Sequence, residues 1–83
     1  MSEGSALDDH QIAAVLMRLA QDRGDDKTFC PSEAARALDP ENWRALMPEI
    51  RRVAASLSLK ATQRGTPVNP VTARGPIRLG RRR

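Results

Sequence analysis

The chain has 83 residues, enough for one domain that buries roughly 60% of the surface its unfolded form exposes, with no room for a large internal cofactor site. Hydrophobic residues make up 40% of the chain and aromatic residues 2%, namely Phe29 and Trp43, so we expect a mainly aliphatic core. The net charge is +4, while one cysteine and one histidine exclude an internal disulfide and fall short of a structural zinc site, which has roughly four ligands.

Residues 1–6 are expected to be a disordered N-terminus. They contain no basic run followed by an apolar stretch, which excludes a standard signal peptide. No segment of the chain approaches the roughly 20 apolar residues of a membrane span. We therefore expect a cytoplasmic protein that does not enter a membrane.

The first predicted helix covers residues 8–23. Its apolar residues recur at helical spacing, at Ile12, Val15, Leu16 and Leu19. Asp8 and Asp9 favour a helix start, and Gly24 favours a helix end. After a polar turn, the β-prone residues 28–30 are expected to form a short strand.

A second helix is predicted over Pro31–Leu38, because proline suits the first helical position and Glu33 suits the positive end of the helix dipole. Residues 39–41 repeat the start signal, with Asp39 as the expected N-cap. Two helix starts separated by about eight residues are typical of a helix-turn-helix.

The next apolar series runs from Trp43 to Leu57 along one helical face, with Pro48 inside it. A proline within a helix removes one hydrogen bond and costs about 3 kcal/mol. Either one helix bends before Pro48, or a short helix ends there and another begins. We expect the second arrangement.

Residues 59–64 alternate in polarity, and Arg64-Gly65 or Gly65-Thr66 can form a tight turn before a returning strand. Residues 77–79 are expected to be the final strand, paired with the strand at residues 28–30. The predicted fold is α+β and helix-rich: a winged helix-turn-helix with three to four helices and a small antiparallel sheet. The domain would span residues 7–79, followed by a flexible basic tail at residues 80–83.

Several motifs occur together in one order along the chain: Phe29–Leu38, Trp43–Pro48, Thr62–Gly65 and Ala73–Leu79. They resemble a family of small bacterial proteins known as domain-of-unknown-function family 3253, over about residues 12–79. This resemblance implies a winged-helix-like fold and brings no established activity. Cys30–Glu33 also resembles the start of the second helix in many winged-helix regulators, where Ser or Thr often occupies the place of Cys30.

Charge is distributed unevenly along the chain. Residues 1–43 hold nine acidic and four basic residues, whereas residues 44–83 hold ten basic and one acidic residue. A strongly basic end attracts polyanions through its long-range field, which favours nucleic acid as the partner. The alternative is an ordinary solvated surface, because arginine-rich composition can also follow from a GC-rich genome.

The candidate nucleic-acid-binding residues are the ten basic residues of this second half. Three belong to the outer face of the helix after Trp43, which would enter the major groove: Arg44, Arg51 and Arg52. Four belong to or flank the wing: Lys60, Arg64, Arg74 and Arg78. Three form a flexible arm: Arg81, Arg82 and Arg83. Both aromatic residues are expected in the core rather than stacked on bases, so duplex nucleic acid is favoured over single strands.

No catalytic set is expected, and neither is a cofactor, a metal or a small-molecule substrate. The one histidine, His10, shows no sign of meeting Cys30, and the glycines form no phosphate-binding loop. The acidic pairs at residues 8–9 and 25–26 lack the further oxygen ligands of a calcium loop, so helix capping and turn formation explain them better. Cys30, at a helix start, is a candidate redox thiol, but a small and mostly buried residue is the better interpretation.

Three functional hypotheses follow. The first is a winged-helix module that binds duplex nucleic acid; about six phosphate contacts would give a log–log salt slope near −5. The second is a protein-interaction or dimerisation adaptor with an acidic protein partner, since a fold does not fix a function. The third is a thiol switch at Cys30, which requires a thiol pKa well below about 8.5.

Overall fold

A computed structural model describes residues 8–24, 27–57 and 59–81 of the chain. These residues form three helices and four short strands, in the order α1 (Asp9–Arg23), β1 (Thr28–Phe29), α2 (Pro31–Leu38), α3 (Trp43–Ser56), β2 (Lys60–Gln63), β3 (Thr66–Pro67) and β4 (Arg78–Gly80). The expected disorder of residues 1–6 lies outside the described residues, as does that of residues 82–83.

Helix α1 begins and ends where the sequence predicts. Asp8 is its N-cap: the Asp8 carboxylate accepts a 2.9 Å hydrogen bond from the Gln11 amide, and the Gln11 side chain accepts one from the Asp8 amide. This reciprocal pair satisfies two backbone donors that the first helical turn leaves open. Gly24 ends the helix with a φ of 81°, a conformation that suits glycine.

Helix α2 is confirmed over Pro31–Leu38, while the strand before it is one residue shorter than expected. Cys30 leaves the strand and becomes the N-cap of α2. The backbone amide of Cys30 donates a 3.1 Å hydrogen bond to the Glu33 carboxylate. The same carboxylate forms an ion pair with Arg23 at the end of α1. Glu33 therefore joins the ends of two helices.

Helix α3 corrects two expectations. It is one helix with Pro48 inside it, so the predicted break at Pro48 is wrong. Its apolar stripe continues across Pro48 to Ile50 and Val53, both buried, and only an unbroken helix keeps that stripe on one face. Packing of the stripe outweighs the one hydrogen bond that proline removes. The second correction is the N-cap, which is Asn42 rather than Asp39; Asp39 closes a turn by accepting from the Asn42 amide.

The strands form one antiparallel sheet in the order β1-β4-β2-β3. Strand β4 lies between β1 and β2, and its predicted pairing with β1 is confirmed. In this pairing Leu79 lies opposite Phe29. Arg64 and Gly65, with φ values of 54° and 82°, form the two-residue turn between β2 and β3. Two successive positive φ values define the turn type that matches the twist of a hairpin. Gly80, expected in the tail, is buried and is the last residue of β4.

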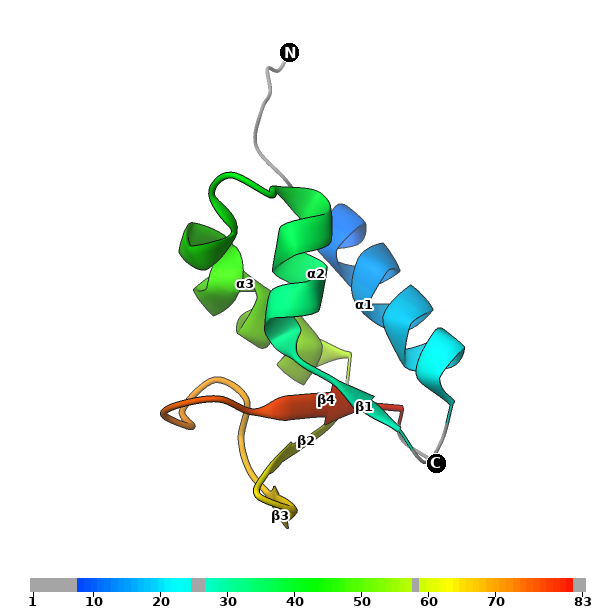
Figure 1. Ribbon diagram of the computed structural model, residues 1–83, viewed down its shortest axis with the longest axis vertical. Coiled ribbons are helices and arrows are strands. Elements are labelled where there is room, and N and C mark those ends of the chain that lie inside the picture. Colours follow the sequence, from blue (N-terminus) through cyan, green and yellow to red (C-terminus); the bar gives the residue numbers. More distant parts are fainter. Residues whose placement is uncertain (1–7, 25–26, 58, 82–83) are drawn as a thin grey trace.

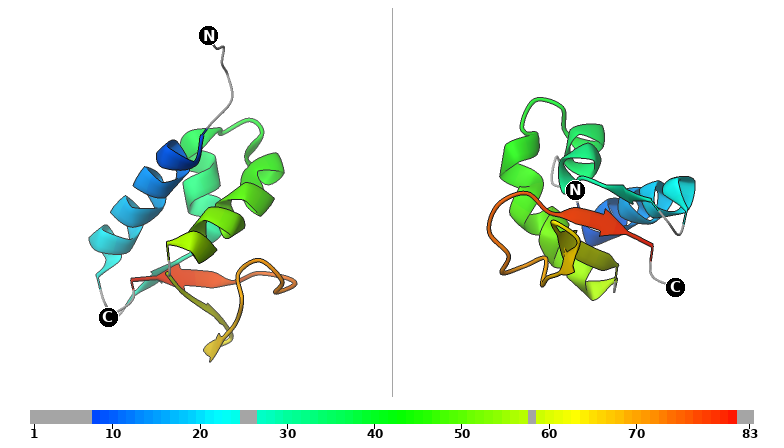
Figure 2. Two further views of the ribbon diagram at one scale, coloured as in Figure 1. Left: turned by 180° about the vertical axis from the view of Figure 1, so that it is seen from behind. Right: turned by 60° about the horizontal axis from the view of Figure 1, so that its bottom comes forward.

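The three helices lie on one side of the sheet, as Figure 1 and the reverse view in Figure 2 show. One core lies between the layers and is lined almost entirely by aliphatic side chains, with Phe29 as its only fully buried aromatic residue in the described part. Trp43 is only partly buried, which corrects its expected place in the core. The architecture is α+β and winged-helix-like: α3 is followed by the β2–β3 hairpin, and a loop of residues 68–77 leads from the hairpin into β4.

Candidate functional site

Helix α3 exposes two adjacent stripes, which we name by the elements that they approach. The loop-side stripe consists of Arg44, Pro48, Arg51 and Ala55, spaced by three or four residues, and its members Arg51 and Ala55 lie beside the loop of residues 68–77. The α1-side stripe is shifted by one position and consists of Ala45, Glu49, Arg52 and Ser56. Arg51 and Arg52 are therefore consecutive in sequence but belong to different surfaces.

Arg51 joins the loop-side stripe to the loop. Its guanidinium donates hydrogen bonds of 2.6 Å to the carbonyl oxygen of Ala73 and 2.7 Å to that of Gly75. The planar fork of arginine suits two nearby acceptors, because both bonds form in one side-chain geometry. Helix α3 and the loop are thereby held as one surface.

The loop is also held from the hairpin. The Gln63 side-chain amide donates to the carbonyl oxygens of Arg74 at 2.5 Å and Pro76 at 3.2 Å. Gly75 has a φ of 84°, which turns the chain between these two acceptors. The backbone of residues 73–76 is therefore fixed on two sides, by Arg51 and by Gln63, and the Arg74 side chain leaves a constrained backbone.

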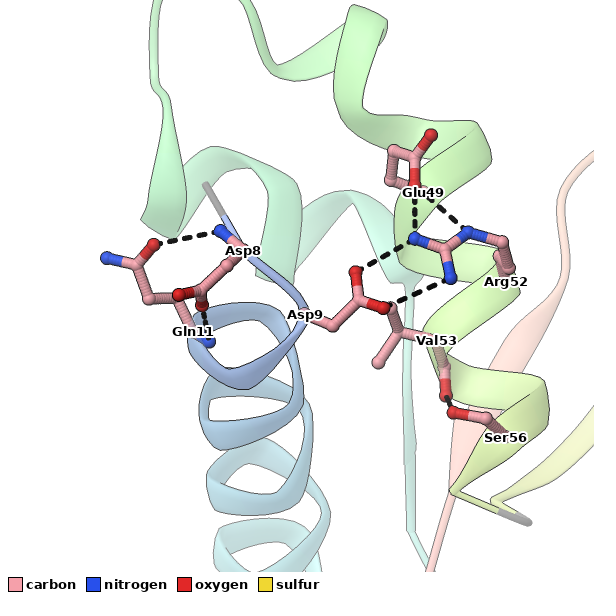
Figure 3. A network of polar contacts seen from close by, with 7 residues as sticks. All are labelled: Asp8, Asp9, Gln11, Glu49, Arg52, Val53 and Ser56. Carbon is pink, nitrogen blue, oxygen red and sulfur yellow. Dashed lines mark hydrogen bonds and ion pairs between the residues drawn. The ribbon is translucent and has the colours of Figure 1, made fainter. Parts of the chain in front are cut away.

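Arg52 takes a different role, shown in Figure 3. It makes a two-point contact with the Asp9 carboxylate, at 2.8 and 3.2 Å, and also pairs with Glu49 at 2.5 Å. The hydrogen bond from Arg52 holds the pKa of Asp9 below its ordinary value of 3.8, and the bond to Asp9 raises the pKa of Arg52 above its usual range. Two carboxylates neutralise Arg52, which connects the start of α1 to the second half of α3.

Arg78 is also bonded within the domain. Its guanidinium donates to the Thr28 hydroxyl at 3.0 Å and to the Thr28 carbonyl oxygen at 2.9 Å. These bonds connect the Arg78 side chain of β4 to Thr28 of β1, in addition to the backbone pairing of the two strands. Because both acceptors are neutral, the positive charge of Arg78 remains uncompensated.

Arg44 lies over the Trp43 ring at 4.6 Å from its centroid, and Arg36 of α2 lies over the same ring at 4.4 Å. Such cation–π contacts restrain exposed guanidinium groups while leaving their charge intact. Arg36 was not among the candidate residues. The predicted turn between the two helices is a signal that could have identified Arg36, because such a turn brings the end of the first helix close to the start of the second.

The remaining candidates that the structure describes are exposed. Arg64 occupies the hairpin turn, Arg74 the loop and Lys60 the first position of β2. Arg81 is exposed and follows β4, while Arg82 and Arg83 lie outside the described residues. The described candidates therefore do not form one face: Arg52 belongs to the α1-side stripe, Arg44 and Arg51 to the loop-side stripe, Arg64 to the hairpin turn and Arg74 to the loop.

The other chemical candidates are Cys30 and His10, which lie at the starts of α2 and α1. Cys30 is half-buried, and its sulfur accepts a 3.0 Å hydrogen bond from the Ser32 hydroxyl. His10 is exposed in the first turn of α1. Within residues 8–24, 27–57 and 59–81, no group of three or more histidine, cysteine or acidic side chains is placed to hold a metal ion. None of the helices in this part of the chain has the length and apolarity needed to cross a membrane.

Comparison with known proteins gives a family and no activity. No curated protein matches the chain. The family model described as "Protein of unknown function (DUF3253)" matches residues 9–82, which include every described helix and strand. The chain therefore belongs to the DUF3253 family of proteins of unknown function.

Proposed function

We propose that this protein is a cytoplasmic, non-enzymatic helix-turn-helix module that binds duplex nucleic acid along α3 and the loop of residues 68–77. In a winged helix, the helix in the position of α3 enters the major groove, and flanking elements contact the backbone. The observation that carries the proposal is the pair of hydrogen bonds from Arg51 to Ala73 and Gly75, because it joins helix and loop into one surface.

The charge of this surface supports the proposal. Arg51 donates to neutral carbonyl oxygens, so its positive charge is not cancelled. The loop-side stripe contains no acidic residue, and Arg64 and Arg74 extend the positive charge beyond it. Lys60 of β2 lines a small hollow together with Ala55 of the loop-side stripe, so a further cation lies beside this stripe. A surface of one sign attracts the phosphates of a duplex and releases their counterions.

The structure narrows the set of expected phosphate contacts. Arg52 is neutralised by Asp9 and Glu49 and is removed from the set, whereas Arg78 keeps its charge because its Thr28 acceptors are neutral. Five exposed cations remain on or beside the proposed surface: Arg44, Lys60, Arg64, Arg74 and Arg78. Five phosphate contacts correspond to a log–log salt slope of about −4.5.

The test is the affinity for a short random-sequence DNA duplex, measured by fluorescence anisotropy over a series of salt concentrations. R44Q and R74Q should each weaken binding and reduce the magnitude of the salt slope by about 0.9. R18Q is the matched control, because it removes the same charge from an exposed position on α1.

Two results would contradict the proposal. One is the absence of binding at low salt; the other is an equal loss from R18Q and R44Q, which would indicate attraction by net charge alone. Self-association at low salt, measured by sedimentation in the absence of duplex, would instead favour the adaptor hypothesis.

A further inference from the structure

A hollow of about 810 Å³ lies between the β2–β3 hairpin, the loop of residues 68–77 and the start of α2. Its volume falls in the range of about 300–1,000 Å³ that is typical of small-molecule sites. A second hollow, beside Lys60, measures about 320 Å³ and has one cation in its lining. The larger hollow is therefore distinguished by both size and charge.

Three arginines from three segments line the larger hollow: Arg64 from the hairpin turn, Arg74 from the loop and Arg78 from β4. None of its described lining residues is acidic. The nearby carboxylate of Glu33 is outside the lining and is paired with Arg23. The positive charges of the hollow are thus left without an acidic partner among the residues that form it.

The walls of the hollow are held in place before any ligand arrives. The two bonds from Gln63 and the two from Arg51 fix the backbone on either side of Arg74. Arg78 is fixed by its two bonds to Thr28, which use only part of its five N–H donors. Binding to such a site loses less conformational entropy than binding to a site that must first become ordered.

The rest of the lining is largely apolar. Val68 and Pro76 contribute accessible apolar surface, and the half-buried Cys30 contributes a small side chain at the start of α2. A ligand that fits this lining carries an anionic group for the arginines and an apolar body for the aliphatic wall. Guanidinium groups suit both phosphate and carboxylate, which they bind through paired hydrogen bonds.

We propose that this hollow is a binding site for a small organic anion, with a phosphate or carboxylate group held by Arg64, Arg74 and Arg78 and an apolar body against Val68 and Pro76. The site does not require the protein to bind nucleic acid. Because Arg64 and Arg74 also belong to the proposed duplex surface, a bound anion would compete with duplex phosphates there.

The test is an NMR titration of the isotopically labelled full chain at constant ionic strength. Phenyl phosphate and benzoate are the two probes, one for each anionic group. Inorganic phosphate supplies charge without an apolar body, and benzyl alcohol supplies the ring without charge. We expect saturable amide shifts at Cys30, Gln63, Gly75 and Ile77 with one of the two probes, and binding at least about tenfold weaker with either control compound.

Variants locate the site. R74Q and R64N should each weaken binding of the active probe by about tenfold, since each removes a charge-assisted contact. Asparagine tolerates the positive φ at position 64, so the hairpin turn is preserved. R44Q is the control; it removes a charge from α3 outside the hollow and should leave the dissociation constant unchanged.

The absence of saturable shifts with both probes would overturn the proposal. Equal binding of inorganic phosphate, or an equal loss from R44Q, would also overturn it, because each indicates diffuse charge rather than a built site. These results are independent of the duplex experiment. Phenyl phosphate or benzoate can bind to a protein that ignores DNA, and DNA can bind to a protein whose hollow stays empty.

Discussion

The two sides of helix α3 use neighbouring arginines in opposite ways. On the α1 side, Arg52 is paired with Asp9 and Glu49, and its charge is cancelled where it lies. On the loop side, Arg51 is bonded to the carbonyl oxygens of Ala73 and Gly75, and its charge persists. A basic residue therefore contributes to a positive surface according to the charge of its acceptor, and the number of its hydrogen bonds does not decide this.

Because of this difference, the net charge of the chain does not give the charge of each surface. The basic half of the chain carries ten positive residues, but contact with the acidic half removes Arg52 from the positive surface. Asp9 of α1 and Glu49 of α3 itself neutralise Arg52 on the side of α3 that packs beside α1. The excess positive charge is left on the side of the hairpin and loop.

The largest expected effect comes from the core that supports both sides. F29A removes a fully buried ring from β1, beside Leu79 of β4. Deletion of a buried aromatic side chain costs about 3–5 kcal/mol, which is a large part of the stability of a domain of this size. Chemical denaturation should show a largely unfolded variant. A midpoint within error of the wild type would contradict the assigned core.

The second-largest effect is expected for the contact between Arg51 and the loop, on the loop side of α3. R51M keeps much of the aliphatic stem but removes both bonds to the loop, so we expect a loss of about 1–3 kcal/mol of unfolding free energy. Amide hydrogen exchange should accelerate at residues 73–76 more than in α1. R51K is the conservative partner; its single ammonium cannot reproduce the fork and should restore only part of the protection. Uniform acceleration across the domain would argue against a local clamp.

A smaller effect is expected in the hairpin turn. G65A introduces a side chain at a φ of 82°, where the space around the Cβ is open but the backbone conformation disfavours L-residues. The cost should be about 1 kcal/mol, from conformation rather than collision. Thermal unfolding would measure it. The companion variant R64G relieves the positive φ of 54° and should not destabilise the turn conformation.

The smallest effect is the titration of the α1-side contact. The pKa of Asp9 is held below 3.8 by the bond from Arg52, so this contact stabilises the fold above that pH and is lost as the pH falls through the lowered value. R52Q should return the pKa of Asp9 toward its ordinary value, as measured by NMR of the side-chain carboxyl. An unchanged pKa would show that the pair does not persist in solution. Duplex binding should be unaffected, in contrast to R44Q.

The local elements of this protein could be predicted from local signals. Asp8 with Gln11, Pro31 with Glu33, and Arg64 with Gly65 each act within a few residues, through capping bonds or through preferred φ values. The path of α3 through Pro48 could not be predicted in this way. Its continuity depends on Ile50 and Val53 meeting a core built from other elements, and this packing offsets the local cost of proline.

The same distinction between local signals and tertiary contacts applies to the candidate site. The sequence by itself determined that a basic half follows an acidic half, that α3 carries arginines, and that a hairpin and a final strand complete the sheet. Only the tertiary structure decided that Arg52 meets Asp9, that Arg51 and Gln63 fix the loop, and that Arg64, Arg74 and Arg78 surround one hollow. The physical reason is range: capping and turn preferences act between neighbours in sequence, whereas a charge is cancelled or exposed by whatever residue the fold places beside it.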